Sequence, residues 1–167
     1  VHARDRVDAS MQILRHDAEH DAVTGVFSRR AFDAALEQLA DDDAIALVVV
    51  DIDDFKSVND SFGHATGDDV LRCVAACLAA NRRTGDRVYR LGGDELAVLM
   101  LGCGPQVARA RAEAIRNAVE SSPALSFMTA IAARVRGSAE RTSPRAVTVS
   151  VGVACQPDHV HHRVELL

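Results

Sequence analysis

The sequence predicts an α/β (α+β) domain with a central sheet flanked by helices, and a few observations support it. Residues 44–50 form an apolar, β-branched run that is typical of a strand buried on both faces. Residues 88–91 and 96–100 are two further apolar runs separated by a double glycine, which is typical of a tight antiparallel hairpin. Apolar residues recur at helical spacing in three other segments: 29–39, 66–82 and 105–121.

The composition indicates one globular domain. The chain has 167 residues, of which 48% are hydrophobic and 26% charged, enough for a real core. A formal net charge of -5 argues against binding to nucleic acid polymers, which requires a basic face. No apolar run approaches the roughly 20 residues of a membrane helix, and no secretory signal is visible. We expect a cytoplasmic fragment without membrane contact. A longer parent protein could still have a membrane anchor elsewhere.

The amino-terminal segment is predicted to be helical. Residues 1–20 are polar, with a few apolar residues, as in the end of a longer linker helix; a frayed terminus is the alternative. Ser28 is then a suitable N-cap for a helix through Leu39, with Phe32, Leu36 and Leu39 on its inward stripe.

The buried strand ends abruptly in carboxylates, beginning with Asp51. Charges at the end of a buried strand cost free energy unless something pairs with them. If this strand lies beside the hairpin, Asp51 and Asp94 converge, and the Ile52 carbonyl adds a third hard oxygen. Such a donor set suits Mg²⁺, whose coordination substrate phosphates and water would complete.

The hairpin itself combines Gly92 and Gly93 with Asp94 and Glu95. The glycines suit a turn that needs positive φ, and they let a bulky ligand approach the backbone. The two acids are expected at the first strand positions, pointing to opposite faces, so that one can hold a metal while the other has a different role. An ordinary solvated hairpin tip is the alternative.

The remaining helices are predicted from caps and spacing. A short helical turn over 55–60 and a loop at 62–64 precede a helix that Thr66 caps, with Asp68 and Asp69 favourably placed in its first turn. The helix that starts at Pro105 has Val107, Ala108, Ile115 and Val119 as its apolar positions.

Other features carry weaker signals. The layout of residues 122–146 cannot be assigned from their pattern. The four cysteines form no CxxC pair, so packed, reduced thiols are expected rather than zinc or disulfides. The histidines near the carboxyl end, at 159, 161 and 162, lack neighbouring acids or cysteines and are expected to be exposed.

Several ordered motifs together resemble the GGDEF family of diguanylate cyclases. They cover the chain from about Asp21 to Ala154 in the family's order. The motifs are Asp21-Ala22-Val23-Thr24-Gly25-Val26-Phe27-Ser28-Arg29-Arg30, Asp51-Ile52-Asp53-Asp54-Phe55-Lys56-Ser57-Val58-Asn59-Asp60, Phe62-Gly63-His64, Arg90-Leu91-Gly92-Gly93-Asp94-Glu95-Leu96 and Val147-Thr148-Val149-Ser150-Val151-Gly152-Val153-Ala154.

The resemblance implies a fold and a reaction. The sheet would be mainly antiparallel, similar to the palm of nucleotide cyclases and polymerases. Two GTP molecules would be joined into cyclic di-GMP with release of pyrophosphate, each 3′-hydroxyl attacking the α-phosphate of the other nucleotide. Two Mg²⁺ ions per site, with Mn²⁺ as an alternative, would assist this displacement. Because one domain binds one GTP, catalysis would require a homodimer.

The resemblance also implies roles for individual residues. Asp51, the Ile52 carbonyl and Asp94 would hold the metals, with Glu95 in support. Backbone amides around Asp54 and Phe55, together with Lys56, would meet the β- and γ-phosphates. Asn59 and Asp68 would bind the guanine edge, although Asp68 also has a plain explanation as an acid on the helix dipole.

An Arg-x-x-Asp motif, Arg83 to Asp86, stands at the spacing of the family's inhibitory product site. A polar connector between helix and strand is the alternative. The sequence departs from the family at Leu96, where phenylalanine is usual, and at Asp54, where a bulky residue is common. The family continues into a final helix with phosphate-binding basic residues, so we expect residues 21–167 to be a truncated domain that normally follows a sensory domain.

Two other functions compete with the cyclase. An EF-hand-like calcium loop starting at Asp51 would need an oxygen ligand at Phe55, glycine at Lys56 and glutamate at Phe62, and it fails at all three. A catalytically weak or inactive module that binds GTP or senses cyclic di-GMP through Arg83 and Asp86 is the second. The intact double glycine and acidic pair favour catalysis over this alternative.

Overall fold

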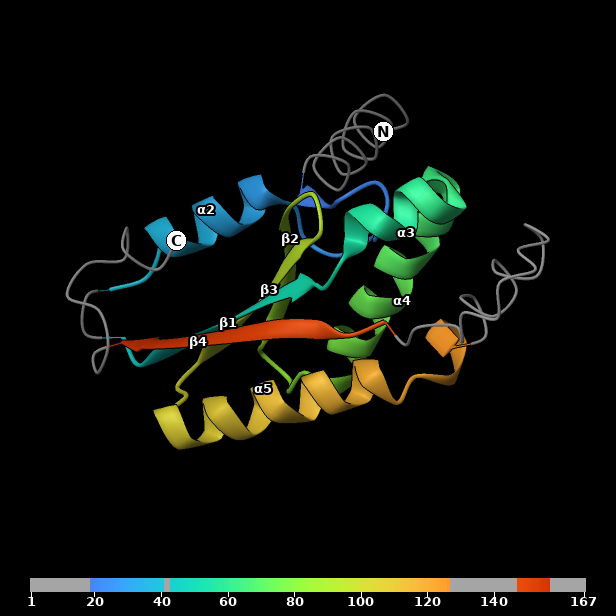
Figure 1. Cartoon of the computed structure of the whole chain (residues 1–167). Helices are drawn as coiled ribbons and strands as arrows, with labels where there is room; N and C mark the ends of the chain where they lie inside the picture. Colours follow the sequence, from blue (N-terminus) through green and yellow to red (C-terminus); the bar gives the residue numbers. More distant parts are fainter. Residues whose placement is uncertain (1–18, 41–42, 127–146, 157–167) are drawn as a thin grey trace, which may run out of the picture.

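The computed structural model describes residues 19–40, 43–126 and 147–156, and these form one sheet with helices on both sides (Figure 1). In chain order, the helices and strands are α2 (Arg29–Glu37), β1 (Ile45–Ile52), α3 (Phe55–Phe62), α4 (His64–Asn81), β2 (Arg87–Gly92), β3 (Glu95–Leu101), α5 (Pro105–Glu120) and β4 (Val149–Gln156).

The sheet has the strand order β2-β3-β1-β4. Each neighbouring pair is antiparallel, which confirms the predicted α/β (α+β) architecture. β1 lies between β3 and β4, so both of its backbone edges are paired. Its unbroken apolar sequence, in contrast to an alternating one, follows from the cores that cover both faces of the sheet at β1.

The side chains of β1 alternate between two cores. Ala46, Val48 and Val50 pack in the larger core, together with buried residues of α4 and α5. Ile45 and Leu47 pack on the opposite face, together with buried residues of α2 and β2. Figure 1 shows α2 and α5 on opposite sides of the sheet. Both faces of β1 are therefore covered, and near its end Asp51 is only partly buried while Ile52 is again in the larger core.

The start of α2 follows the prediction. Ser28 Oγ accepts a hydrogen bond from the Ala31 amide at 3.3 Å, as expected of an N-cap. Phe32 is fully buried on the inward face of the helix.

The start of α4 differs from the prediction. The helix begins at His64, and Thr66 lies inside it with its hydroxyl donating to the Phe62 carbonyl at 3.0 Å. The predicted loop at 62–64 is also wrong, because Gly63 alone separates α3 from α4. Gly63 has a φ of 84°, a conformation that glycine reaches without steric cost, so the chain turns within one residue. The first turn of α4 consequently contains no acidic residue, and Asp68 lies beyond it.

The α5 helix begins at Pro105 as predicted, but one assigned core position is wrong. Ala108, Ala112, Ile115 and Val119 are its buried residues, whereas Val107 is 47% exposed. The buried positions recur at intervals of four, three and four residues, and Val107 lies off that stripe.

The hairpin turn is confirmed with a shift of one residue. Gly92 pairs with Glu95, so Gly93 and Asp94 make the turn and Asp94 is not a strand residue. Gly93 has a φ of 51°, which explains the need for glycine there. Leu96, the first buried residue of β3, is fully enclosed in the larger core and fills the apolar site expected for it.

Some predictions fall outside the described residues: the linker helix through residue 18, the segment 127–146 and the carboxyl-terminal histidines. Within the described ranges, no helix has the length and apolar character needed to cross a membrane. The four cysteines are free thiols, as the sequence predicts.

Candidate active site

Acidic side chains gather where β1 ends beside the hairpin turn. Asp51 and Glu95 are direct partners across the β1–β3 pair, and Asp94 lies in the adjoining turn. Burial raises the pKa of Asp51, and repulsion from Asp94, Glu95 and Asp53 raises it further. Glu95 therefore shares the surroundings of Asp51 instead of pointing to an unrelated face.

This arrangement fits a divalent cation. Like charges placed opposite each other across two strands destabilise a sheet unless a positive charge lies between them. No ion pair neutralises Asp51, Asp94 or Glu95 within the described part of the chain. Carboxylate oxygens and the nearby Ile52 carbonyl are the hard donors that Mg²⁺ and Mn²⁺ prefer. Across the same residues no group of three or more His, Cys, Asp or Glu side chains is placed to hold a metal, so these carboxylates do not form a complete metal site by themselves.

The loop after β1 contains only Asp53 and Asp54 before α3 begins. Asp54 has a φ of 54°, and its carbonyl accepts the amides of Ser57 at 2.8 Å and Val58 at 3.3 Å, which starts the helix. Phe55 is the first residue of α3 and Lys56 the second, and Lys56 is exposed. The first amides of a helix have no partners within it, so this end of α3 suits an anion.

Asp53 is hydrogen-bonded to residues at the start of β4, and its carboxylate still repels that of Asp51. Its Oδ2 accepts from the Thr148 hydroxyl at 2.6 Å and its Oδ1 from the Ser150 hydroxyl at 2.7 Å. These two hydrogen bonds lower the pKa of Asp53. No sequence pattern indicates this contact, because the partners lie 95 and 97 residues further along the chain.

The two predicted guanine-binding residues lie on adjoining helices. Asn59 on α3 is half-buried, and its side chain occupies the space in front of Gly67 on α4. A methyl group on Gly67 would overlap Asn59 Oδ1 and press on the Phe55 ring. Asp68 follows Gly67 directly, so a bare glycine lets Asn59 lie next to the turn that carries Asp68. Sequence reasoning missed Gly67, since its role depends on the approach of a second helix.

The Arg83 and Asp86 side chains bond to each other. The Arg83 guanidinium donates to the two carboxylate oxygens of Asp86, each at 3.3 Å, and the Arg83 amide adds a bond of 2.9 Å. These contacts raise the pKa of Arg83. The Asp86 side chain is 3% exposed and that of Arg83 is 33% exposed. The ion pair therefore lies within the connection between α4 and β2. One third of the Arg83 side chain remains accessible to solvent.

Comparison with known proteins identifies the family. A family model described as the GGDEF domain of diguanylate cyclases matches residues 18–167. The chain belongs to this family. The match confirms the resemblance on which the site assignments depend.

Curated relatives of this GGDEF domain include diguanylate cyclases. The chain is 34% identical to TpbB of Pseudomonas aeruginosa over 159 residues, which cover 92% of the chain and 34% of the relative. It is 34% identical to VdcA of Vibrio cholerae over 116 residues, which cover 69% of the chain and 34% of that relative. The chain therefore spans about one third of the length of these proteins.

Among solved structures, the GGDEF domain is similar to the coiled coil and GGDEF domain of DgcB from Caulobacter crescentus, which was solved with cyclic di-GMP. The TM-score is 0.79 at 29% identity, and the match covers 98% of this chain and 83% of that one. This likeness confirms the α+β fold.

A further contact in the GGDEF domain joins the opening motif to the hairpin turn. Arg90 Nη1 lies 3.1 Å and 3.2 Å from the two carboxylate oxygens of Asp21. Its Nε and Nη2 donate to the Gly93 carbonyl at 3.1 Å and 2.7 Å. Asp21 also accepts from the amide and hydroxyl of Thr24. Burial raises the pKa of Asp21, but the bonds from Thr24 and Arg90 outweigh it and leave the pKa lowered. Both residues belong to motifs visible in the sequence, but nothing in the sequence connects them.

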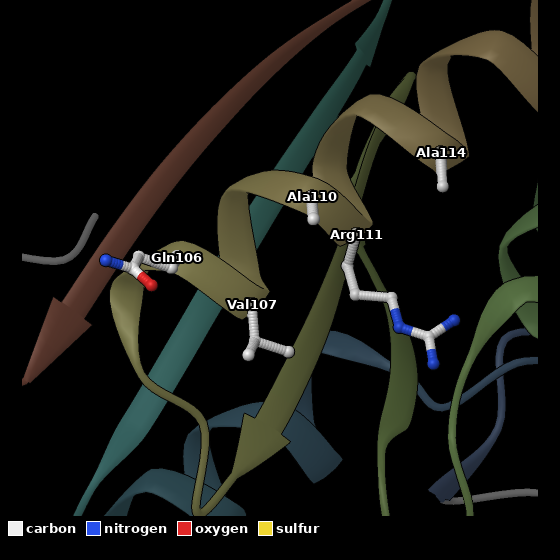
Figure 2. A pocket seen from close by; sticks show the side chains of 5 residues that line it. All are labelled: Gln106, Val107, Ala110, Arg111 and Ala114. Carbon is white, nitrogen blue, oxygen red and sulfur yellow. The ribbon is translucent and has the colours of Figure 1, made fainter.

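A separate cavity of about 420 Å³ lies on α5 (Figure 2). Its walls are mostly apolar, with Arg111 at one side donating to the Asn81 carbonyl at 3.1 Å. None of the lining residues belongs to the predicted site; they are Gln106, Val107, Ala110, Arg111 and Ala114.

Proposed function

We propose that this GGDEF domain condenses two GTP molecules into cyclic di-GMP and releases pyrophosphate. The observation that carries the proposal is the gathering of Asp51, Asp94 and Glu95 at one strand end beside a glycine turn. The exposed backbone of Gly92 and Gly93 leaves room for a nucleotide to approach these carboxylates.

Two divalent cations, Mg²⁺ or Mn²⁺, would be held by Asp51, the Ile52 carbonyl and Asp94, with Glu95 in support. When bound, such ions activate an attacking hydroxyl and neutralise the charge of the pyrophosphate leaving group. The mutual repulsion that raises the pKa of Asp51 supports this assignment, because a cation would relieve it.

The start of α3 would bind the phosphates. The amides around Asp54 and Phe55 point out of a helix N-terminus, where they attract anions, and Lys56 adds a positive charge beside them. These groups would orient the β- and γ-phosphates and leave the α-phosphate near the carboxylates.

Asn59 and Asp68 would select guanine. A carboxylate accepts from the ring N–H and the exocyclic amine of guanine, and an amide can meet the remaining edge. The packing of Asn59 against Gly67 supports a joint role, since it places both residues at one junction of α3 and α4. Asp68 lies beyond the first turn of α4, where the helix dipole has little effect on a charge. A favourable interaction with the dipole therefore explains little of why an acid is found at this position.

Each domain would bind one GTP, so two copies must face each other for both bonds to form. A homodimer is therefore part of the proposal. We also propose that residues 1–20 link the domain at 21–167 to an upstream sensory domain, which would control how the two copies meet.

The Arg83–Asp86 pair is proposed to bind product and so inhibit the enzyme. The guanidinium already has part of its donor fork on Asp86, so cyclic di-GMP would have to share or displace those bonds. The one-third exposure of the Arg83 side chain supports access to a ligand.

The test is incubation of the purified protein with GTP and Mg²⁺, followed by nucleotide chromatography. Appearance of cyclic di-GMP and pyrophosphate is expected. A protein that binds cyclic di-GMP and forms none would instead be a sensor module, which the exposed edge of Arg83 also favours.

A further inference from the structure

Asp53 stands between two groups of atoms that the proposed function uses. The Ile52 carbonyl precedes it, and the amides around Asp54 and Phe55 follow it. Hydrogen bonds join Asp53 to Thr148, the residue directly before β4, and to Ser150 on β4. Its two carboxylate oxygens accept the hydroxyls of Thr148 and Ser150, and its amide donates to the Thr148 carbonyl at 3.1 Å.

This contact holds the short β1–α3 loop at Asp53, next to the Asp54 carbonyl that accepts the amides of Ser57 and Val58. Two residues must end a central strand and begin α3, and Asp54 does so in a left-handed conformation that non-glycine residues rarely adopt. A strained backbone persists only when its surroundings hold it. The Asp53 bonds to Thr148 and Ser150 supply such a hold at the residue that directly follows the strand.

We propose that Asp53 is a positioning residue: it ties the β1–α3 loop to β4 and so holds the Ile52 carbonyl and the following amides in register with the nucleotide. The inference rests on the proposed function. It separates Asp53 from Asp51, the other acid of the Asp-x-Asp pattern. Asp51 pairs with Glu95 across the sheet and is repelled by Asp94, whereas Asp53 accepts the hydroxyls of Thr148 and Ser150.

The chemistry of the partners provides a sharp test. Serine and threonine hydroxyls can both donate and accept, so asparagine at position 53 can keep both bonds by accepting one and donating the other. A residue that coordinates a cation through its charge would not tolerate this change. The substitution Asp53→Asn therefore distinguishes positioning from metal binding. Asp53→Ala removes the charge and both hydrogen bonds from the hydroxyls.

The first measurement is the affinity for an unreactive α,β-methylene analogue of GTP with Mg²⁺, by calorimetry. Asp53→Ala and the double variant Thr148→Val, Ser150→Ala should each bind the analogue at least tenfold more weakly than wild type. Asp53→Asn should stay within about threefold of wild type. Adding Asp53→Ala to the double variant should cause little further loss, because both hydroxyl bonds to the carboxylate are already gone. Thermal unfolding of each variant checks that the fold persists.

The opposite pattern overturns the inference. If Asp53→Asn is as impaired as Asp53→Ala while the hydroxyl double variant binds normally, Asp53 acts as a charged ligand. If wild type binds no GTP analogue, the proposed function fails instead, and a ligand-free measurement decides about the loop. Amide hydrogen exchange over residues 52–56 should be at least tenfold faster in the hydroxyl double variant and unchanged in Asp53→Asn. Equal exchange in all variants would show that the Asp53 bonds do not hold the loop.

Discussion

Arg90 Nη1 lies 3.1 Å from Asp21 Oδ1, which joins the opening motif of this GGDEF domain to the hairpin that carries its acidic pair. The same guanidinium donates twice to the Gly93 carbonyl in the turn. The side chains of Arg90 and Asp21 are 15% and 22% exposed, so the contact is largely shielded from solvent. One arginine thus fixes the turn beside Asp94 while a distant aspartate fixes the arginine.

The first prediction concerns this link. Arg90→Lys should lower the initial rate of cyclic di-GMP synthesis by about tenfold, since lysine lacks the planar fork that reaches Asp21 and Gly93 together and charged hydrogen bonds contribute roughly 1.5–3 kcal/mol. Steady-state kinetics on the purified variant would measure it. Arg87→Lys is a matched control, because Arg87 is an exposed residue of the same strand that lies over the Phe27 ring, a contact lysine can keep. Equal rates for both variants would exclude a role for the link.

A second prediction concerns the metal ligands. Asp94→Ala and Asp51→Ala should each lower synthesis by roughly 100-fold or more, because a bound cation supplies several kcal/mol of charge stabilisation. Both residues lie at the end of the packed region, so circular dichroism should show an intact fold. Product formation at the wild-type rate by either variant would exclude the two-metal assignment.

The third prediction is that removing the charge of Asp51 raises the stability of the metal-free protein, although the same residue is needed for activity. The pKa of Asp51 is raised in the folded state by burial and by its acidic neighbours. A raised carboxyl pKa contributes stability at low pH, which is lost as the pH rises through the folded-state value. At pH 7 without divalent metal, Asp51→Asn should therefore have a higher melting temperature than wild type, and the gain should shrink as the pH falls toward 4.

Asp53→Asn is the internal comparison for that experiment. The pKa of Asp53 is lowered by its bonds to Thr148 and Ser150, so its stabilising effect exists at neutral pH and is lost on acidification. Substituting Asp53 should not raise the melting temperature at pH 7. A lower melting temperature for Asp51→Asn at neutral pH would show that the acidic cluster is not under repulsive strain.

Much of the fold could be predicted from local sequence, and the reasons are physical. The continuous apolar run of β1 reflects burial on both faces of the sheet. The glycines of the hairpin reflect a turn that needs positive φ. Gly63 is a position where local sequence was not enough. Its positive φ lets α4 begin at His64, and no local pattern predicts this early start. The prediction of Thr66 as the N-cap was wrong for that reason. A cap predicted from residue type depends on a boundary that tertiary packing can shift.

The site shows the same division. Asp51 and Asp94 could be paired from sequence, because a strand end beside a hairpin brings them together. The bonds from Asp53 to Thr148 and from Arg90 to Asp21 could not, since they span 95 and 69 residues and follow no periodicity. Contacts of this kind depend on which distant segment tertiary packing brings beside the residue: the start of β4 for Asp53 and the loop before α2 for Arg90.

The fourth prediction concerns base selection. Asn59→Ala or Asp68→Ala should weaken GTP binding by at least about tenfold while ATP binding changes little, because polar groups built for one base edge are left unmatched by another. Competition binding with the two nucleotides would measure the ratio. Gly67→Ala should have a similar effect without removing either functional group, since its methyl would displace Asn59. Equal losses for both nucleotides would assign these residues to packing.

The last prediction concerns Arg83. Arg83→Ala should weaken cyclic di-GMP binding at least tenfold, about 1.4 kcal/mol, because alanine removes the fork of charged donors. The initial synthesis rate should not fall, since Arg83 bonds to Asp86 and to the Leu101 carbonyl and not to the hairpin turn. Calorimetry with product alone measures the affinity without requiring activity. Some loss of stability is also expected, roughly 1–3 kcal/mol, because the buried Asp86 carboxylate would lose both guanidinium bonds and keep only the backbone amide of residue 83.

Arg82→Ala is the matched control for this experiment, because Arg82 contacts only the Asp86 carbonyl, at 3.2 Å, among the hydrogen bonds of the described chain. It should bind cyclic di-GMP as wild type does. Asp86→Asn separates affinity from stability further, since asparagine can still accept from Arg83 through its carbonyl oxygen and leaves the guanidinium in place. If Arg83→Ala loses stability and keeps its affinity for product, the Arg83–Asp86 pair is a structural connector between α4 and β2, and any feedback control must act elsewhere.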